Sequence, residues 1–201
     1  MQLLPKPERD SRLLKLSESA QLPERSQLQM VEKADVVECA NRDRVVIFID
    51  GANLFYGAAQ LNIEIDYIKL LYYLTKSRRL VRAYFYTGVD RSNDKQQGFL
   101  MWMRHNGYRV ITKDVIQLPD GSKKANLDVE IAVDMMKLAS YCDGVVLVSG
   151  DGDLAYVVNA LGYQGVQIEV VSLYSMTSDS LIKVADCYTD LASIKQDIQK
   201  V

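Results

Sequence analysis

The sequence predicts an α/β fold built around a parallel sheet, and two features of the chain support this prediction. From Arg44 onward, short apolar runs alternate with helical patterns, which is the rhythm of βαβ units. Two of the runs, at residues 45–50 and 144–149, are rich in β-branched residues and are followed by small and acidic residues. Such runs suit strands that are buried on both faces of a sheet. We therefore expect one main domain, with its ligand site at the carboxyl ends of the strands.

The individual elements follow from periodicity and from start and stop signals. Strands are expected at residues 45–50, 80–87, 108–112, 144–149 and 166–172. Helices are expected at 66–75 behind an Asp66 cap, at 90–106 up to an Asn106-Gly107 stop, at 126–141 and at 153–162. Residues 116–124 contain Pro-Asp-Gly and predict a small hairpin or loop, and the part after residue 180 should be helical with one extended segment. The helix at 126–141 is apolar almost all round, so we expect it to be buried.

The composition is that of an ordinary globular protein. Of the 201 residues, 48% are hydrophobic and 25% are charged, which is enough to fill one sizeable core. The formal net charge is -2 and the pI is about 5.5, so no global basic field indicates nucleic acid. The charge is uneven, however, because residues 45–125 carry a net charge of +5 and residues 126–201 one of -7.

The two ends of the chain differ from its centre. Residues 1–43 are polar, balanced in charge and contain three of the four prolines, which predicts a flexible or helical arm. Such an arm could bind a second copy of the chain or another protein. Residues 44–192 are expected to form the main domain, and residues 193–201 a C-terminal tail.

Cysteine usage and hydropathy suggest a compartment. The three cysteines, Cys39, Cys142 and Cys187, are widely spaced without a CxxC motif, which argues against a thiolate zinc site and fits a reducing environment. We interpret them as small buried hydrophobes. No stretch approaches the ~18 apolar residues of a membrane span, and the N-terminus lacks an apolar signal core. We expect a cytoplasmic protein without membrane contact.

Acidic residues follow two of the predicted strands. Asp50 ends the first strand, and Asp151 and Asp153 come directly after the fourth. A helix cap explains any one of them, because carboxylates are favoured at helix N-termini. Two aspartates together, opposite Asp50, are harder to explain without a cation. Asp128, near the start of the helix at 126–141, would join them, since a buried carboxylate needs a partner.

If Asp50, Asp128, Asp151 and Asp153 converge, they form a site of oxygen ligands without histidine or thiolate. Such a site suits Mg²⁺ or Mn²⁺ rather than Zn²⁺. Divalent ions held by carboxylates orient a water nucleophile and neutralise charge on a scissile phosphate. Asn53 could orient that water or a phosphate oxygen, although a hydrogen bond at the helix start explains it equally well.

Other charged residues are less clearly placed. Asp134 lies about 240° around its helix from Asp128, so spacing alone does not put both in one coordination shell. Four basic residues fall on segments expected at the same sheet edge, where they could hold RNA phosphates, although a solvated charged face explains each one singly. They are Arg91, Lys95, Lys123 and Lys124.

The chain resembles the NYN domain, in its LabA-like branch of the PIN-like nucleases, through three motifs. These are FIDGANL at 48–54, KKANLDVEIAVDM at 123–135 and VSGDGDLAYVV at 148–158, and LIKVADCYTDL at 181–191 is similar to the closing segment of the family. The resemblance covers residues 44–190 and implies a PIN-like three-layer α/β/α fold, with a central parallel sheet in the strand order 3-2-1-4-5. The chain departs from the family at Leu154, where an aromatic residue is commoner.

The resemblance also implies a ribonuclease that depends on Mg²⁺ or Mn²⁺ and acts on single-stranded RNA. It assigns metal binding and catalysis to Asp50, Asp128, Asp151 and Asp153, with Asn53 in support and Asp134 as a further metal position. Members of this branch are also linked to regulation. The open alternative is therefore a non-catalytic RNA-binding or regulatory module that retains the fold.

Two other phosphate chemistries are disfavoured by the sequence. Gly150, Gly152 and Ala155 match the dinucleotide pattern G-x-G-x-x-A, but the aspartates between and after the glycines would repel a pyrophosphate. A phosphatase of the haloacid-dehalogenase type needs a second carboxylate two residues after its nucleophile, where this chain has Ala52.

Overall fold

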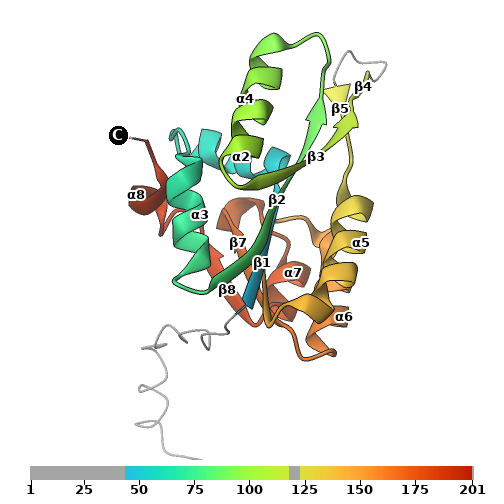
Figure 1. The fold of residues 1–201 in the computed structure, drawn as a ribbon. Coiled ribbons are helices and arrows are strands. Elements are labelled where there is room, and N and C mark those ends of the chain that lie inside the picture. Colours follow the sequence, from blue (N-terminus) through green and yellow to red (C-terminus); the bar gives the residue numbers. More distant parts are fainter. Residues whose placement is uncertain (1–43, 118–122, 201) are drawn as a thin grey trace, which may run out of the picture. The chain divides into compact units, whose positions relative to one another are not determined.

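The computed structural model describes residues 44–117 and 123–200 (Figure 1). The expected N-terminal arm and the Pro119-Asp120-Gly121 turn lie outside the described residues. The hairpin expected around that turn is formed by β4 (Ile116–Gln117) and β5 (Lys123–Lys124), which pair in the antiparallel sense.

A six-stranded sheet forms the centre of the described chain, and all its neighbouring strands are parallel. The strand order is β3-β2-β1-β6-β7-β8. The five expected strands take the predicted order 3-2-1-4-5, and β8 adds a sixth strand beside β7, which is a difference from the prediction. The strands are β1 (Arg44–Asp50), β2 (Arg79–Val89), β3 (Tyr108–Asp114), β6 (Gly144–Val148), β7 (Gln167–Ser172) and β8 (Cys187–Asp190).

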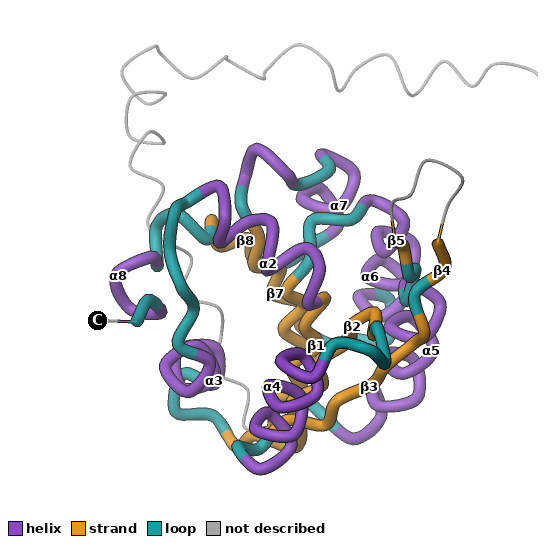
Figure 2. The backbone as a smooth tube through the Cα atoms, turned by 90° about the horizontal axis from the view of Figure 1, so that it is seen from above, coloured by secondary structure: helices purple, strands orange, loops and turns teal. Residues whose placement is uncertain are grey.

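Helices cover both faces of this sheet, which confirms the predicted α/β/α layers (Figure 2). One face is covered by α2 (Gly51–Gln60), α3 (Tyr67–Thr75), α4 (Asp94–His105) and α8 (Lys195–Ile198). The other is covered by α5 (Asp128–Leu138), α6 (Ala155–Gly162) and α7 (Asp179–Val184). Because Ile194 and Ile198 are buried in the first of these cores, the C-terminal segment packs onto the sheet domain.

The central strand β1 shows why the sheet needs a layer on each side. Its residues 45–49 are all 0% exposed. Val46 and Phe48 belong to the core under α5 and α6, whereas Val45, Ile47 and Ile49 belong to the core under α2 and α3. An unbroken apolar run is therefore stable here only because both faces of the strand are covered.

Helix α5 is less buried than its sequence predicts. Ile131 and Met135 are buried, but Val129, Val133 and Met136 are 69%, 43% and 43% exposed. The expectation of a helix buried all round is therefore wrong, because α5 packs on the sheet through a single stripe. The helix also ends earlier than expected, at Leu138, and a 3₁₀ turn continues to residue 141.

A buried ion pair joins the end of α3 to β7. The side chains of Arg78 and Glu169 are 3% and 6% exposed and pair through Nη1 and Oε1. Arg78 also donates from Nη2 to the Leu74 carbonyl at 2.8 Å and from Nε to the Thr75 carbonyl at 3.1 Å. These bonds satisfy a guanidinium that would otherwise be costly to bury.

Two of the broader expectations can be compared with the structure. Among the described residues, no helix combines the length and the apolar character needed to span a bilayer. Cys142 is buried and free, as expected for a small hydrophobe. Cys187 is half-buried in β8, so the same expectation fits it less well.

Candidate acidic site

The ends of β1 and β6 bring two acidic segments to one edge of the sheet. The two strands are parallel neighbours, with Ile49 paired to Val148, so the residues that follow them lie side by side. The Ser149 hydroxyl donates a hydrogen bond to Asp50 Oδ2 at 3.2 Å and accepts one from the Asp151 amide at 3.2 Å. Ser149 therefore joins the two segments, a role that its place in the sequence does not predict.

Asp50 caps the next helix, which is one of the roles that the sequence predicts for it. Its Oδ1 accepts hydrogen bonds from the amides of Ala52 at 3.0 Å and Asn53 at 3.2 Å at the start of α2. Burial nevertheless raises the pKa of Asp50, the three hydrogen bonds from Asn53, Ser149 and Ala52 oppose that rise, and the charge of Asp151 adds to it. The carboxylate is thus a cap and also part of an acidic cluster.

The loop after β6 has the same cap geometry. Asp151 Oδ1 accepts from the Asp153 amide at 2.9 Å at the start of a 3₁₀ turn, Gly152–Leu154. The Asp153 side chain is exposed. Asp151 lines the same pocket as Asp50, whereas Asp153 is not part of that lining.

Asp128 approaches the cluster from the start of α5. Asn126 holds it in place, donating from Nδ2 to Asp128 Oδ2 at 2.6 Å and accepting from the Asp128 amide at 3.0 Å. Burial raises the pKa of Asp128, and so, in decreasing order, do the charges of Asp151, Asp50 and Asp153, against the opposing bond from Asn126. Asp128 is therefore close enough to each of the other three predicted aspartates to be affected by its charge.

These side chains surround one polar pocket of about 470 Å³. Its lining includes Asp50, Asp128 and Asp151, together with Asn53 and Lys124. Asn53 Oδ1 accepts from the Ser172 hydroxyl at 3.1 Å, which ties the amide to the end of β7. The prediction that Asp50, Asn53, Asp128 and Asp151 come together thus matches the geometry, and Asp153 lies just outside the lining.

Asp134 faces a different partner. Its Oδ2 accepts a hydrogen bond from the Tyr86 hydroxyl at 3.0 Å, and it is absent from the lining of the pocket. Tyr86 is 1% exposed and does line the pocket. Burial first and then the charge of Asp134 raise the pKa of Tyr86, so the phenol stays protonated and donates. Asp134 supports a wall of the pocket through Tyr86.

The four predicted basic residues are not equally placed. Lys124 lines the acidic pocket, and Lys123 precedes it in β5. Lys95 is exposed on α4. Arg91 is exposed but already holds Asp114, donating from Nε and Nη2 at 3.1 and 3.0 Å. Its guanidinium is therefore less available to a phosphate than the sequence alone suggests.

The donor set of the pocket fits a hydrated divalent cation. Its charged donors are carboxylates, without a histidine or a thiolate, and they repel one another, which a cation would relieve. Within the described residues, no three acidic, histidine or cysteine side chains are grouped tightly enough to hold an ion on their own. Mg²⁺ does not require such a group, because it keeps several waters and binds through one or two carboxylates.

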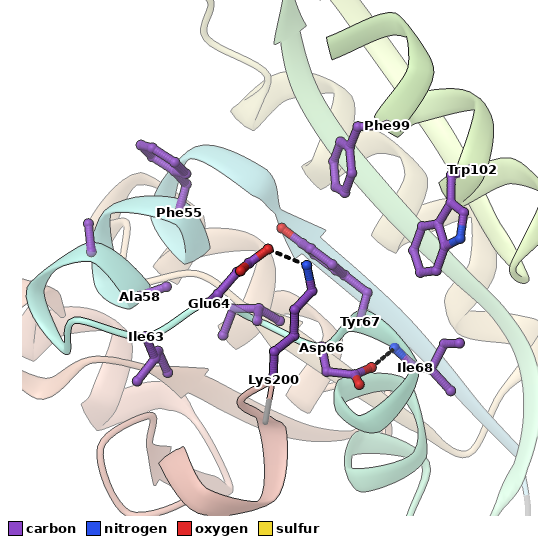
Figure 3. A pocket seen from close by; sticks show the side chains of 12 residues that line it. Phe55, Ala58, Ile63, Glu64, Asp66, Tyr67, Ile68, Phe99, Trp102 and Lys200 are labelled. Carbon is purple, nitrogen blue, oxygen red and sulfur yellow. Dashed lines mark hydrogen bonds and ion pairs between the residues drawn. The ribbon is translucent and has the colours of Figure 1, made fainter. Parts of the chain in front are cut away.

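A second hollow, of about 570 Å³, lies between α2, α3 and α4 (Figure 3). Phe55, Tyr67, Phe99 and Trp102 line it, and its Glu64 carboxylate is paired with Lys200. Its walls are largely apolar, and its second carboxylate, Asp66, caps α3 by accepting from the amides of Ile68 and Lys69. This hollow therefore lacks the clustered carboxylates of the acidic pocket.

Comparisons with known proteins agree with the fold and with the order of the motifs. The NYN domain profile matches residues 44–192. The Low amplitude and bright protein LabA of Synechococcus elongatus is 36% identical over 165 residues, which covers 78% of this chain and 88% of that protein. A crystal structure of a protein of unknown function from Vibrio parahaemolyticus superposes with a TM-score of 0.69 at 28% identity, covering 80% of this chain and 98% of the other. With its PIN-like α/β fold and a match over most of its length, the chain belongs to the NYN domain family.

Proposed function

We propose that this protein is a ribonuclease that hydrolyses phosphodiester bonds of single-stranded RNA at the acidic pocket, with Mg²⁺ or Mn²⁺ as its cofactor. One observation supports this most strongly: carboxylates from three separate segments meet around one polar pocket. Asp50 comes from the end of β1, Asp128 from the start of α5 and Asp151 from the loop after β6. Membership of a family related to nucleases supports the same reaction class.

The charge balance of the pocket supports a cation as a resident ligand. Asp50 and Asp128 both have raised pKa values, with burial as the first cause and the neighbouring aspartates as a further one. A bound Mg²⁺ or Mn²⁺ would neutralise this charge and would supply an activated water and a counter-charge for the phosphate. Asp50, Asp128 and Asp151 would hold it, with Asp153 at the outer side and Asp134 acting through Tyr86.

The remaining residues of the pocket suit the binding of a phosphodiester. Lys124 would attract the phosphate as a point charge, with Lys123, Lys95 and Arg91 farther out for the flanking backbone. Asn53 has its Oδ1 engaged by Ser172, and its Nδ2 donates to no described residue. That amide nitrogen is therefore suited to donate to a phosphate oxygen or to orient a water molecule.

A test compares cleavage of labelled single-stranded RNA by the parent, by Asp50→Asn and by Asp151→Asn, with Mg²⁺ or Mn²⁺ and with a chelator. Asp66→Asn is a matched control, because Asp66 caps α3 through the same pair of amide bonds, at 3.0 and 3.1 Å, outside the acidic pocket. We expect metal-dependent products from the parent and the control, and a loss of about 100-fold or more in the two pocket variants. Cutting by Asp50→Asn at the parent's rate would refute the assignment.

The second candidate is a non-catalytic RNA-binding or regulatory module. It is favoured by the lack, among the described residues, of any group of three acidic, histidine or cysteine side chains that could hold a metal ion. The same experiment separates the two functions. RNA binding by the parent without any products in either metal would establish the module, and a metal-dependent ladder of products would exclude it.

A further inference from the structure

Three arginines surround a hollow of about 380 Å³ beside the edge strand β3. They come from three different elements: Arg82 from β2, Arg104 from the last turn of α4 and Arg109 from β3. All three side chains are exposed. The hollow is thus a place where three guanidinium groups converge at the surface, apart from the acidic pocket.

These arginines have no acidic partner within residues 44–117 and 123–200. Three of the other four described arginines do: Arg44 pairs with Asp143, Arg78 with Glu169 and Arg91 with Asp114. Among the described side chains, none accepts a hydrogen bond from the guanidinium groups around the hollow or forms an ion pair with them. Like charges that share a site without a counter-charge repel one another, so a bound anion would lower the electrostatic energy of this surface.

Structural roles account for only part of this arrangement. A charged residue such as Arg109 protects an exposed edge strand from pairing with another chain. Arg104 is favourable at the C-terminal end of α4 because of the helix dipole. Neither reason applies to Arg82, because β2 lies between β1 and β3 and is not an edge strand. The convergence of all three therefore needs a further explanation.

The strand register puts two of the arginines on the same face of the sheet as Asp50. Arg82 pairs with Val46, Tyr84 with both Phe48 and Arg109, and Tyr86 with Asp50. Paired residues of parallel strands share a face, and alternate residues return to it. Arg82 and Arg109 therefore lie about 13 Å and 7 Å along the strands before the row of Asp50. One extended strand of nucleic acid is long enough to reach both places.

We propose that Arg82, Arg104 and Arg109 form a phosphate-binding subsite for the backbone of a nucleic acid strand, separate from the acidic pocket. Guanidinium groups suit this role, because each can donate two parallel hydrogen bonds to one phosphate. The proposal rests on the nucleic-acid part of the proposed function but does not require cleavage. The subsite would position RNA whether the acidic pocket cuts it or only holds it.

The test measures binding of the full chain to a labelled 20-nucleotide single-stranded RNA in a chelator, over a series of salt concentrations. The variant is Arg104→Gln/Arg109→Gln. The control is Lys137→Gln/Lys183→Gln, which removes the same charge from exposed positions on α5 and α7. Each lost phosphate contact lowers the salt slope by about 0.7, so we expect a decrease of about 1.4 and roughly 25-fold weaker binding at 0.1 M salt. The control should keep the parent's slope.

Further variants keep the outcome clear. Arg104→Lys/Arg109→Lys retains the charge and should retain the slope, and the single change Arg104→Gln, at an exposed helix end, should lower it by about 0.7 even if the double variant is unstable. An unchanged slope in Arg104→Gln/Arg109→Gln, or a parent that binds no RNA at low salt, would overturn the subsite. A variant that keeps its RNA binding but loses binding to phosphatidylserine vesicles would also overturn the subsite, because the partner would then be a lipid surface. If the parent binds RNA through these arginines but does not cut it, the ribonuclease assignment fails and the subsite stands.

Discussion

Replacement of Gly150 by alanine should disturb the loop that positions Asp151. A Cβ atom at Gly150 would lie 2.4 Å from the Met176 carbonyl oxygen, 2.8 Å from Ser172 Oγ and 3.0 Å from the Thr177 Cα atom. Since ordinary contacts begin at 3.4 Å, the loop must move by about 1 Å relative to the Met176 carbonyl. Two of the three atoms belong to the backbone, so a change of rotamer cannot remove the clash.

The expected cost of Gly150→Ala is about 1–3 kcal/mol of unfolding free energy, the usual range for overpacking. Thermal unfolding should therefore occur at a temperature lower by roughly 2–12 °C. If the pocket is catalytic, a displacement of Asp151 by about 1 Å should also reduce RNA cleavage on the order of 100-fold.

Gly98→Ala is the matched control for this change. Gly98 lies inside α4, and a Cβ atom there would meet nothing within 4 Å. Alanine should stabilise this helix by about 0.5–1 kcal/mol and leave cleavage unchanged. If Gly150→Ala unfolds at the same temperature as the parent, this loop is not tightly enclosed.

Two further predictions concern the rest of the domain. Glu169→Gln leaves the buried Arg78 guanidinium with neutral acceptors and without its counter-charge, so denaturant unfolding should show a loss of about 3 kcal/mol. Asp114→Asn, at the exposed pair with Arg91, should cost less than about 1 kcal/mol, and equal losses in the two variants would contradict this reasoning. Burial, and then the charge of Glu64, raise the pKa of Tyr67 to about 12 from an ordinary value of 10.0. The folded state thus favours the protonated phenol, a contribution that is complete below about pH 10 and is lost as the pH rises through 12. The free energy of unfolding, measured from pH 9 to pH 12, should fall more steeply for the parent than for Tyr67→Phe. Parallel curves would refute the stabilising effect of the raised Tyr67 pKa.

The strands of the sheet were predictable because apolar runs in the local sequence indicate that they are buried. The apolar runs in β1 and β6 have no polar residue to place on a solvent face, so a helical layer on each side was required, whereas β7 contains Glu169, whose charge is buried with Arg78. β8 is different, because Cys187–Asp190 is half-buried throughout and has no such run. Its place in the sheet depends on pairing with Glu169–Ser172, which local sequence does not reveal.

The partners within the site were less predictable than its acidic residues. Ser149 meets Asp50 across 99 positions of sequence, and Tyr86 meets Asp134 across 48. Arg91 was expected to be available for phosphate, yet Asp114 at the end of β3 lies within reach of it. The arginine hollow was missed for the same reason, because only the register of β2 and β3 and the end of α4 bring Arg82, Arg104 and Arg109 together.

Asp50 shows why a helix cap and a functional carboxylate are not competing explanations. Asparagine caps a helix about as well as aspartate does, so the cap alone does not require a charge at this position. The charge has a cost here, because the side chain is largely buried and Asp151 adds to the rise of its pKa. Three hydrogen bonds, from Asn53, Ser149 and Ala52, oppose that cost and favour the ionised form. The proposed cation would relieve this cost, and Asp50→Asn, which retains the cap, tests the charge separately from the fold.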